Sequence, residues 1–396
     1  MTASLYIHIP FCAGGKCDYC DFYSIPVNEN STALKDSFIN AVLDDVEDQL
    51  ALFNIEHVPS VYIGGGTPSV LGAQRMEQLL DRLQVLLKPL EKTPAEFTVE
   101  ANPESADVSF LRACANGGVN RISLGVQSFH QPSRRAVNRG NGPRGADSIE
   151  ERLATAAGFF PESLSIDLIA GLPHCTEEIL LNDIERALSF KPVHVSLYSL
   201  ILEPETPLGK MALQHSTDAL FLPQSDNADN IWIAGRDALE KAGLAQYEVS
   251  NFALPGKTCK HNIRYWRMEN WLGAGPAASG TIIDDETGSG RRFTYPAGVE
   301  AYLSASRPRI RHARIEELAQ HDLVREALLM GFRYREGPDL QIFRRRFGRA
   351  VENCIPNAVD KWRKRDFFEG NSLKSSPGGL LFLNSFLRDA FGEISS

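Results

Sequence analysis

The chain of 396 residues is long enough for one large domain with an appendage, and its 43% hydrophobic and 23% charged content is ordinary for a globular protein. Its net charge of −9 argues against a general nucleic-acid-binding role. No apolar run approaches the roughly 20 residues that span a bilayer, and we recognise no signal peptide, so we expect a cytoplasmic protein without a transmembrane segment.

Six β-like runs recur along the chain at spacings that leave room for a helix between them. They are Ser4–Ile9, Val58–Ile63, Glu96–Glu100, Arg121–Val126, Leu164–Ile169 and His194–Leu200. The clearest amphipathic helices between them are Ala33–Leu52 and Gln74–Leu87. This alternation predicts an α/β fold of parallel βαβ units with right-handed crossovers, and the apolar strands predict a sheet that is buried on both faces.

Three of the seven cysteines, Cys12, Cys17 and Cys20, directly follow the first predicted strand. A disulfide needs an oxidising compartment and fits the odd cysteine count poorly. A zinc site would need His8 or a distant residue as its fourth ligand, and a redox pair of Cys17 and Cys20 would leave Cys12 unexplained. An iron–sulfur cluster uses all three thiolates and leaves one iron of a 4Fe–4S cube open to a cofactor or substrate. We therefore favour the cluster.

Each of the six predicted strands ends in residues that carry chemistry. In chain order these are the cysteine loop, Gly64-Gly65-Gly66-Thr67-Pro68, Glu100-Ala101-Asn102-Pro103, Gly125-Val126-Gln127-Ser128, Asp167 before Gly171-Leu172-Pro173, and Ile201 before Glu203 and Glu205. Ordinary turn residues would explain any one of them. Six in order instead predict an active site at one rim of an α/β barrel.

Some of these positions also have a purely structural explanation. The glycine run offers backbone N–H donors and a close approach to a ligand, or it is only a turn. Glu100 is either a charged acceptor at the barrel mouth for a cationic or hydroxyl-bearing ligand, or a solvated loop residue or an acid at the N-terminus of a helix. Asp167 lies between apolar neighbours in a buried strand, which is costly unless it binds a ligand or pairs with Arg121 or Arg139.

The last third of the chain has a different character. After about Ser306 the pattern becomes helical and basic, with one amphipathic helix predicted over Glu316–Phe332 and a hairpin over Leu373–Leu383. We predict a mainly helical, winged-helix-like domain over residues 306–396, preceded by a barrel core over 1–210 and a barrel-associated extension over 211–305. Residues 273–278 imitate a dinucleotide fingerprint, but a clear preceding strand is missing and a proline interrupts them, so we predict no dinucleotide site.

The cysteine loop and the Gly-Gly-Gly-Thr-Pro motif together resemble the radical SAM superfamily, whose CxxxCxxC loop holds a 4Fe–4S cluster. Here four residues separate Cys12 from Cys17, and Gly14-Gly15 can absorb the extra one because glycine reaches positive φ without steric cost. The resemblance implies a partial (β/α)6 barrel in which S-adenosylmethionine binds the open iron. It implies contacts to S-adenosylmethionine from Tyr6, Tyr19, Gly65, Gly66, Thr67, Glu100, Gln127, Arg139, Asp167 and Ile201.

A longer ordered set of motifs is similar to the oxygen-independent coproporphyrinogen III oxidase branch of that superfamily. The set is LYIHIPFC, GGGTPS, EANP, LGVQS, IDLIAGLP and YEVSNF, between about Leu5 and Gly275. The branch contains dehydrogenases of heme biosynthesis and heme chaperones. Its dehydrogenases typically carry a fourth cysteine where this chain has Phe22, and an N-terminal extension before the first strand that we do not find here. Both features favour the chaperone class.

A third feature is the segment from Cys259 to Trp266, which resembles the HNxxYW motif of the chaperone class. The resemblance implies heme contacts from His261, Asn262, Tyr265 and Trp266, since imidazole is a common axial ligand of heme iron and aromatic rings offer flat apolar faces. Alternatively, His261 bonds internal polar groups and the two aromatics belong to the core.

Taken together, the resemblance implies a protein that binds heme, a 4Fe–4S cluster and S-adenosylmethionine, and that transfers heme to an acceptor protein, membrane-associated acceptors included. The enzymatic alternative is radical decarboxylation of coproporphyrinogen III by a dehydrogenase. A second alternative is a heme-binding interaction protein without radical chemistry. Whether the protein is an enzyme stays open at this point.

Overall fold

The computed structural model describes residues 1–28, 30–90, 92–140, 149–214 and 220–394. Six parallel strands form the centre of its main sheet and pair with one another in sequence order. They are β1 (Ser4–Ile9), β4 (Ser60–Gly65), β5 (Glu96–Ala101), β6 (Arg121–Gln127), β7 (Leu164–Ala170) and β8 (His194–Ser199). All six predicted strands are confirmed to within about two residues, and so is the α/β fold class.

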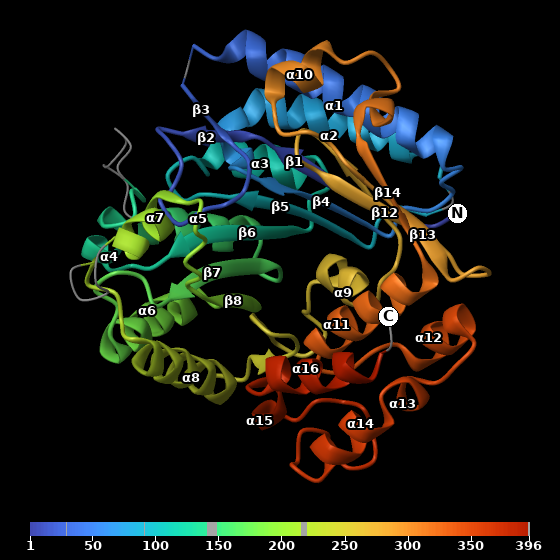
Figure 1. The fold of residues 1–396 in the computed structure, drawn as a ribbon. Helices are drawn as coiled ribbons and strands as arrows, with labels where there is room; N and C mark the ends of the chain where they lie inside the picture. Colours follow the sequence, from blue (N-terminus) through green and yellow to red (C-terminus); the bar gives the residue numbers. More distant parts are fainter. Residues whose placement is uncertain (29, 91, 141–148, 215–219, 395–396) are drawn as a thin grey trace.

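Helices connect these strands and cover the outer face of the sheet (Figure 1). They are α1 (Thr32–Leu52), α2 (Ala73–Leu87), α3 (Val108–Asn116), α5 (Ile149–Phe159), α6 (Glu177–Ser189) and α8 (Ser225–Lys241). Shorter elements lie at the ends of the strands: β2 (Phe11–Ala13) paired with β3 (Ile25–Val27), the 3-10 turn Pro68–Leu71, α4 (Gln131–Arg135) and α7 (Pro207–Gln214). The alternation predicted from the sequence therefore forms βαβ units.

The two outer strands of the parallel group carry extensions. Beside β1 lie β11 (Trp271–Ala274), which is parallel to it, and the antiparallel strands β12 (Ser279–Asp284), β13 (Ser289–Thr294) and β14 (Arg314–Leu318). Beside β8 lie β10 (Asn251–Ala253) and β9 (Ala245–Gln246). Because β14 and β9 end the strand order, the described strands form an open arc. The sequence analysis was wrong to find no strand before residue 273, since β11 occupies that place.

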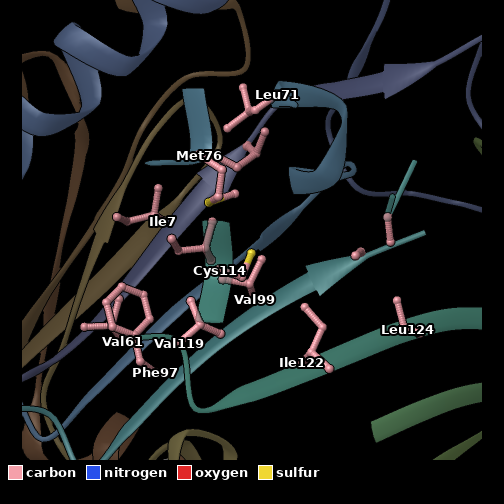
Figure 2. Close-up of a cluster of buried hydrophobic side chains, with 14 of the residues drawn as sticks. Ile7, Val61, Leu71, Met76, Phe97, Val99, Cys114, Val119, Ile122 and Leu124 are labelled. Carbon is pink, nitrogen blue, oxygen red and sulfur yellow. The ribbon is translucent and has the colours of Figure 1, made fainter. Parts of the chain in front are cut away.

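The main hydrophobic core lies between the arc and its covering helices. Figure 2 shows Ile7, Val61 and Val99 of the strands beside Met76 of α2 and Cys114 of α3. All five side chains are fully buried. Each Å² of apolar surface that this core removes from water stabilises the fold by roughly 25 cal/mol. The packed core also holds in place the strand ends that carry the polar residues.

The C-terminal part is mainly helical, as predicted, and has a hydrophobic cluster of its own that includes Phe332, Trp362 and Phe386. Its helices and the segment before them are α10 (Val299–Ser304), the 3-10 turn Arg309–His312, α11 (Gln320–Arg333), α12 (Leu340–Phe347), α13 (Val351–Cys354), α14 (Pro356–Arg363), α15 (Pro377–Leu380) and α16 (Leu383–Glu393). Among the described residues, none of the helices combines the length and the apolar run that a membrane span requires.

Two predictions in this part are wrong. The helix predicted over Glu316–Phe332 begins only at Gln320, because the residues before it pair as β14 with β13. The hairpin predicted over Leu373–Leu383 is instead the short helix α15 and the start of α16. The Ser376 hydroxyl accepts the N–H of Gly379 at 2.9 Å, so Ser-Pro-Gly-Gly starts a helix here and forms no wing.

The C-terminal helices contact both extensions of the sheet. Glu326 of α11 forms an ion pair with Arg292 of β13 at 2.6 Å. Just after the C-terminal end of α11, the N–H of Arg335 donates to the carbonyl of Tyr247 at 2.9 Å. One helix therefore connects the strands beside β1 to the segment beside β8.

Candidate cluster and cofactor site

The three clustered cysteines lie on one loop beyond β1, and all three are partly exposed free thiols. Gly14 and Gly15 have φ angles of +72° and +124°, so the glycines do absorb the extra residue of this loop. The Cys12 thiol donates to Ser24 Oγ at 3.3 Å and accepts from Thr67 Oγ1 at 3.8 Å. Burial raises the pKa of the Cys20 thiol to about 11, so bound metal is needed to hold it as a thiolate.

The assignment of these thiols to an iron–sulfur cluster stays a prediction. Within the described ranges, no three His, Cys, Asp or Glu side chains converge on one point that would hold a single metal ion. In a 4Fe–4S cube each cysteine binds a different iron, so the three cysteine sulfurs need not converge on one point.

The glycine run after β4 lies against the start of the cysteine loop. A Cβ at Gly65, where φ is +107°, would come 2.6 Å from the ring of His8, and one at Gly66 would come 2.5 Å from the carbonyl oxygen of Phe11. The N–H groups of Gly66 and Thr67 donate to the carbonyls of Ile9 and Phe11 at 2.8 and 2.7 Å. The glycines therefore allow two backbone segments to approach, and the expectation that these two N–H groups are free is wrong.

Glu100 and Asp167 lie in the interior of the arc. The Tyr62 hydroxyl donates to Glu100 at 2.6 Å, and the N–H of Gly65 donates to the same carboxylate at 3.3 Å. Burial raises the pKa of Glu100 to about 7, with a further upward contribution from nearby Asp167 and an opposing downward contribution from the hydrogen bond of Tyr62 included in that value. Burial also raises the pKa of Asp167, which accepts from Ser123 at 3.0 Å.

Tyr6 shares this interior, since its ring lies 6.3 Å from that of Tyr62 and its hydroxyl lies 3.0 Å from Nδ1 of His8. Glu100 and Asp167 are both only partly exposed, so the interior keeps a polar surface that solvent reaches. Two acidic side chains on this polar surface can hold a cationic or hydroxyl-bearing ligand.

Arg139 connects the cysteine loop to the strand ends. Its guanidinium donates to Cys17 Sγ at 3.7 Å, to Asn102 Oδ1 at 2.9 Å and to the carbonyl of Gly125. Asn102 in turn donates to Thr67 Oγ1 at 3.1 Å, and Thr67 reaches Cys12. A continuous series of contacts therefore connects Cys17 to Cys12 through Arg139, Asn102 and Thr67.

One hydrogen-bond donor of Arg139 has no partner among the described residues. Arg139 is only 9% exposed, and it is its Nε that has no hydrogen-bond partner in the described part of the chain. A buried guanidinium nitrogen without a partner is costly, which fits a site that a ligand completes. The sequence analysis missed Asn102, although it belongs to the Glu-Ala-Asn-Pro motif at the end of β5.

The remaining residues that are predicted to contact the cofactor lie on the same rim. Gln127 follows a bulge in the pairing of β6 with β7 and has φ of +68°. Tyr19 lies close enough to Arg139 and Cys17 for their charges to influence its pKa, which burial raises. Ile201 follows β8 and is 67% exposed, so it offers an apolar surface on this rim.

The predicted heme residues lie at the opposite end of the strands, on α9 (Lys260–Trp266). Glu96, the first residue of β5, accepts the N–H groups of Lys260 and His261 at 2.8 and 2.9 Å and thereby holds the start of this helix. In Figure 1, α9 lies near the ends where the strands begin, whereas α4 and α7 lie where they end.

The ring of His261 is enclosed there. Its Nδ1 lies 2.9 Å from Ser60 Oγ and its Nε2 lies 3.0 Å from the hydroxyl of Tyr265. His261 is 1% exposed, and burial lowers its pKa to about 3, so the ring is neutral. Asn262, Tyr265 and Trp266 are partly exposed on the same helix. Both ring nitrogens are already hydrogen-bonded, so axial ligation through either nitrogen of His261 requires the contact of that nitrogen to break.

Comparison with known proteins identifies relatives along nearly the whole chain. Residues 6–187 match the family model of the radical SAM superfamily. The chain is 37% identical to heme chaperone HemW of Lactococcus lactis, over 90% of this chain and 88% of that protein. It is 31% identical to heme chaperone HemW of Haemophilus influenzae, over 97% of this chain and 96% of that protein.

Among solved structures, coproporphyrinogen III oxidase (HemN) from Escherichia coli resembles this chain with a TM-score of 0.78. The match covers 98% of this chain and 89% of that chain, at 21% sequence identity. At that identity the likeness shows a shared fold alone.

Proposed function

This chain belongs to the HemW family of the radical SAM superfamily, and from that membership we propose that it is a heme chaperone, which binds heme and transfers it to an acceptor protein. The observation that carries the proposal is the near full-length similarity to proteins of that name, which includes the C-terminal helical part as well as the barrel. The HemN structure shares the fold, and at 21% identity it gives no separate support for porphyrin decarboxylation.

Membership of the radical SAM superfamily implies a 4Fe–4S cluster and S-adenosylmethionine. Cys12, Cys17 and Cys20 would hold the cluster, which when reduced supplies an electron to S-adenosylmethionine. Arg139 and Asn102 keep the cysteine loop in place through the contacts described above. Among the predicted contacts of the cofactor, the carboxylates of Glu100 and Asp167 would accept hydrogen bonds from its polar groups.

We further propose that the protein works in the cytoplasm, because its seven cysteines are free and an exposed iron–sulfur cluster needs a reducing compartment. Its acceptor would be a heme protein, with membrane-associated acceptors included. The HNxxYW segment stays the sequence-based prediction for the heme contacts.

The test is an anaerobic titration of the cluster-loaded protein with heme, followed by the Soret band. We expect saturation near one heme per chain. A parallel assay supplies coproporphyrinogen III, S-adenosylmethionine and a reductant, and we expect no decarboxylated product. Heme binding that does not saturate, or steady formation of decarboxylated porphyrinogen, would contradict the proposal.

A further inference from the structure

The inward face of β4 connects the two ends of the barrel. Side chains alternate along this strand, so Ser60, Tyr62 and Gly64 share one face, while the residues between them belong to the hydrophobic core. At the start of the strand, Ser60 Oγ lies 2.9 Å from Nδ1 of His261. Near its end, a Cβ on Gly64 would come 2.8 Å from Oε2 of Glu100. Tyr62 therefore stands between the segment predicted for heme and the site predicted for S-adenosylmethionine.

The neighbouring strand β5 is arranged in the same way. Its Glu96 lies opposite Ser60 in the register and accepts the two N–H groups at the start of α9. Its Glu100 lies further along the same face. The two strands thus place partners for α9 at one end and a predicted partner for the cofactor at the other, and Tyr62 forms a contact that joins them.

Tyr62 touches a residue at each end. Its ring lies 5.1 Å from the ring of His261, with the two planes 32° apart. Its hydroxyl donates to Oε1 of Glu100 at 2.6 Å. A Cβ on Gly64 would come 2.9 Å from Cε1 of Tyr62, so a glycine at that position leaves the room through which Tyr62 reaches Glu100. One side chain therefore contacts a predicted heme residue and a predicted cofactor residue.

The hydrogen bond between Tyr62 and Glu100 responds to charge. Burial raises the pKa of Tyr62, and the charge of Glu100 raises it further, so this hydroxyl keeps its proton and stays a donor. Burial raises the pKa of Glu100 to about 7, a value that also contains the upward effect of Asp167 and the downward effects of Tyr62 and Arg121. S-adenosylmethionine carries positive charge, which favours the ionised carboxylate, and an ionised acceptor forms the stronger hydrogen bond. Occupation of this site is therefore expected to hold Tyr62 more firmly.

The firmness of this hold matters for His261. Its ring is enclosed by Ser60, Tyr265 and Tyr62, so a ligand that draws the ring away has to separate it from all three contacts or from some of them. A Tyr62 side chain that is fixed at its hydroxyl adjusts less to the space that His261 leaves. Displacement of His261 therefore costs more free energy while Glu100 holds Tyr62.

We propose, on the premise that the protein is a heme chaperone whose HNxxYW segment contacts heme, that Tyr62 is a positioning residue that couples the two sites. Occupation of the cofactor site at Glu100 weakens heme binding at the other end of the barrel. The coupling is reciprocal, so heme weakens the binding of S-adenosylmethionine by the same factor. Tyr62 acts through Glu100 and His261.

The decisive variant is Tyr62→Phe, which removes the hydroxyl and keeps the ring against His261. The Kd for heme is measured anaerobically on cluster-loaded wild type and variant, with and without saturating S-adenosylmethionine. We expect S-adenosylmethionine to raise the Kd of the wild type by about fivefold or more and to leave that of Tyr62→Phe nearly unchanged. Tyr302→Phe is the matched control, because its buried hydroxyl also donates to a carboxylate, that of Asp45 at 2.7 Å, away from both sites. It should keep the wild-type factor.

A second readout is the pH dependence of S-adenosylmethionine binding in the absence of heme. The hydrogen bond from Tyr62 lowers the pKa of Glu100, so its loss raises that pKa. The pH of half-maximal affinity should therefore lie near 7 in the wild type and higher in Tyr62→Phe. A purely structural role of Tyr62 would weaken binding by the same factor at every pH, and that result would contradict the positioning role.

The outcomes for heme separate this inference from the proposed function. Saturable heme binding with no effect of S-adenosylmethionine in the wild type, or with the same effect in Tyr62→Phe, would overturn the coupling and leave the chaperone proposal standing. Wild-type heme affinity in His261→Ala would also overturn it, because heme would then not draw on His261. Absence of saturable heme binding by the wild type would overturn the proposed function and this inference with it.

Discussion

Glu100→Gln is expected to stabilise the cluster-free protein at neutral pH and to weaken its binding of S-adenosylmethionine. Burial raises the pKa of Glu100 from 4.5 to about 7. Between these two values the folded state keeps a proton that the unfolded state has lost, so the stability of the wild type falls as pH rises from about 4.5 to about 7 and is level above. Glutamine remains neutral and removes this dependence.

The size of the effect follows from the shift. About 2.5 pKa units at ~1.36 kcal/mol each give an upper limit of roughly 3 kcal/mol at pH 8, of which about 2 kcal/mol develops between pH 5.5 and pH 8. The hydrogen bond from Tyr62 is retained, since the amide oxygen still accepts it. Because Glu100 keeps some contact with solvent, the measured difference falls below this limit.

Urea unfolding of the cluster-free wild type and of Glu100→Gln at pH 5.5 and pH 8 measures this difference. Glu77→Gln on the exposed face of α2 is the matched control and should follow the wild type. Calorimetry on the cluster-loaded proteins should show S-adenosylmethionine binding on the order of tenfold weaker in Glu100→Gln, because a hydrogen bond to a charged acceptor is lost. Parallel stability curves for wild type and Glu100→Gln would refute the reasoning.

Other predictions concern the cysteine loop and the glycine run. Cys17→Ala should abolish assembly of the iron–sulfur cluster. Cys354→Ala, a substitution in the C-terminal hydrophobic core, should retain full iron and sulfide after reconstitution. Full iron content in Cys17→Ala would contradict the ligand assignment. Gly65→Ala should lower the free energy of unfolding by more than about 1–2 kcal/mol, because the residue has positive φ and its Cβ would meet His8. Gly378→Ala, where the added Cβ meets open space, should change it by less than about 1 kcal/mol, and equal melting of the two variants would contradict this account.

The parallel strands, and the position of three cysteines on one loop after the first strand, could be predicted from sequence because both have local signals. Apolar runs such as Leu164–Ile169 and three thiols within nine residues do not depend on distant contacts. β14 has no such signal: four of its five residues are exposed, and it is a strand only because β13 lies beside it. The wrong hairpin at residues 373–383 has a different cause, since Pro-Gly-Gly suggested a turn although Ser376 caps a helix there.

Side-chain contacts between distant segments were harder to foresee than the strands. Nothing local in the sequence tells that Asn102 connects Thr67 to Arg139, since these residues belong to three different strand-end loops. The enclosure of His261 likewise depends on Ser60 of β4 and Glu96 of β5, far away in sequence. Motif resemblance identified the HNxxYW residues, but only the tertiary fold places them at the end of the strands that lies away from the cysteines.

The helix α11 links the two sides of the open arc. Glu326, in the middle of this helix, is paired with Arg292 of β13, and just after the helix the N–H of Arg335 donates to the carbonyl of Tyr247, on the side of β8 and β10. The two extensions of the sheet are therefore connected by the C-terminal part as well as by the parallel strands between them. Removal of α11 would leave β13 and the segment around Tyr247 without this second connection.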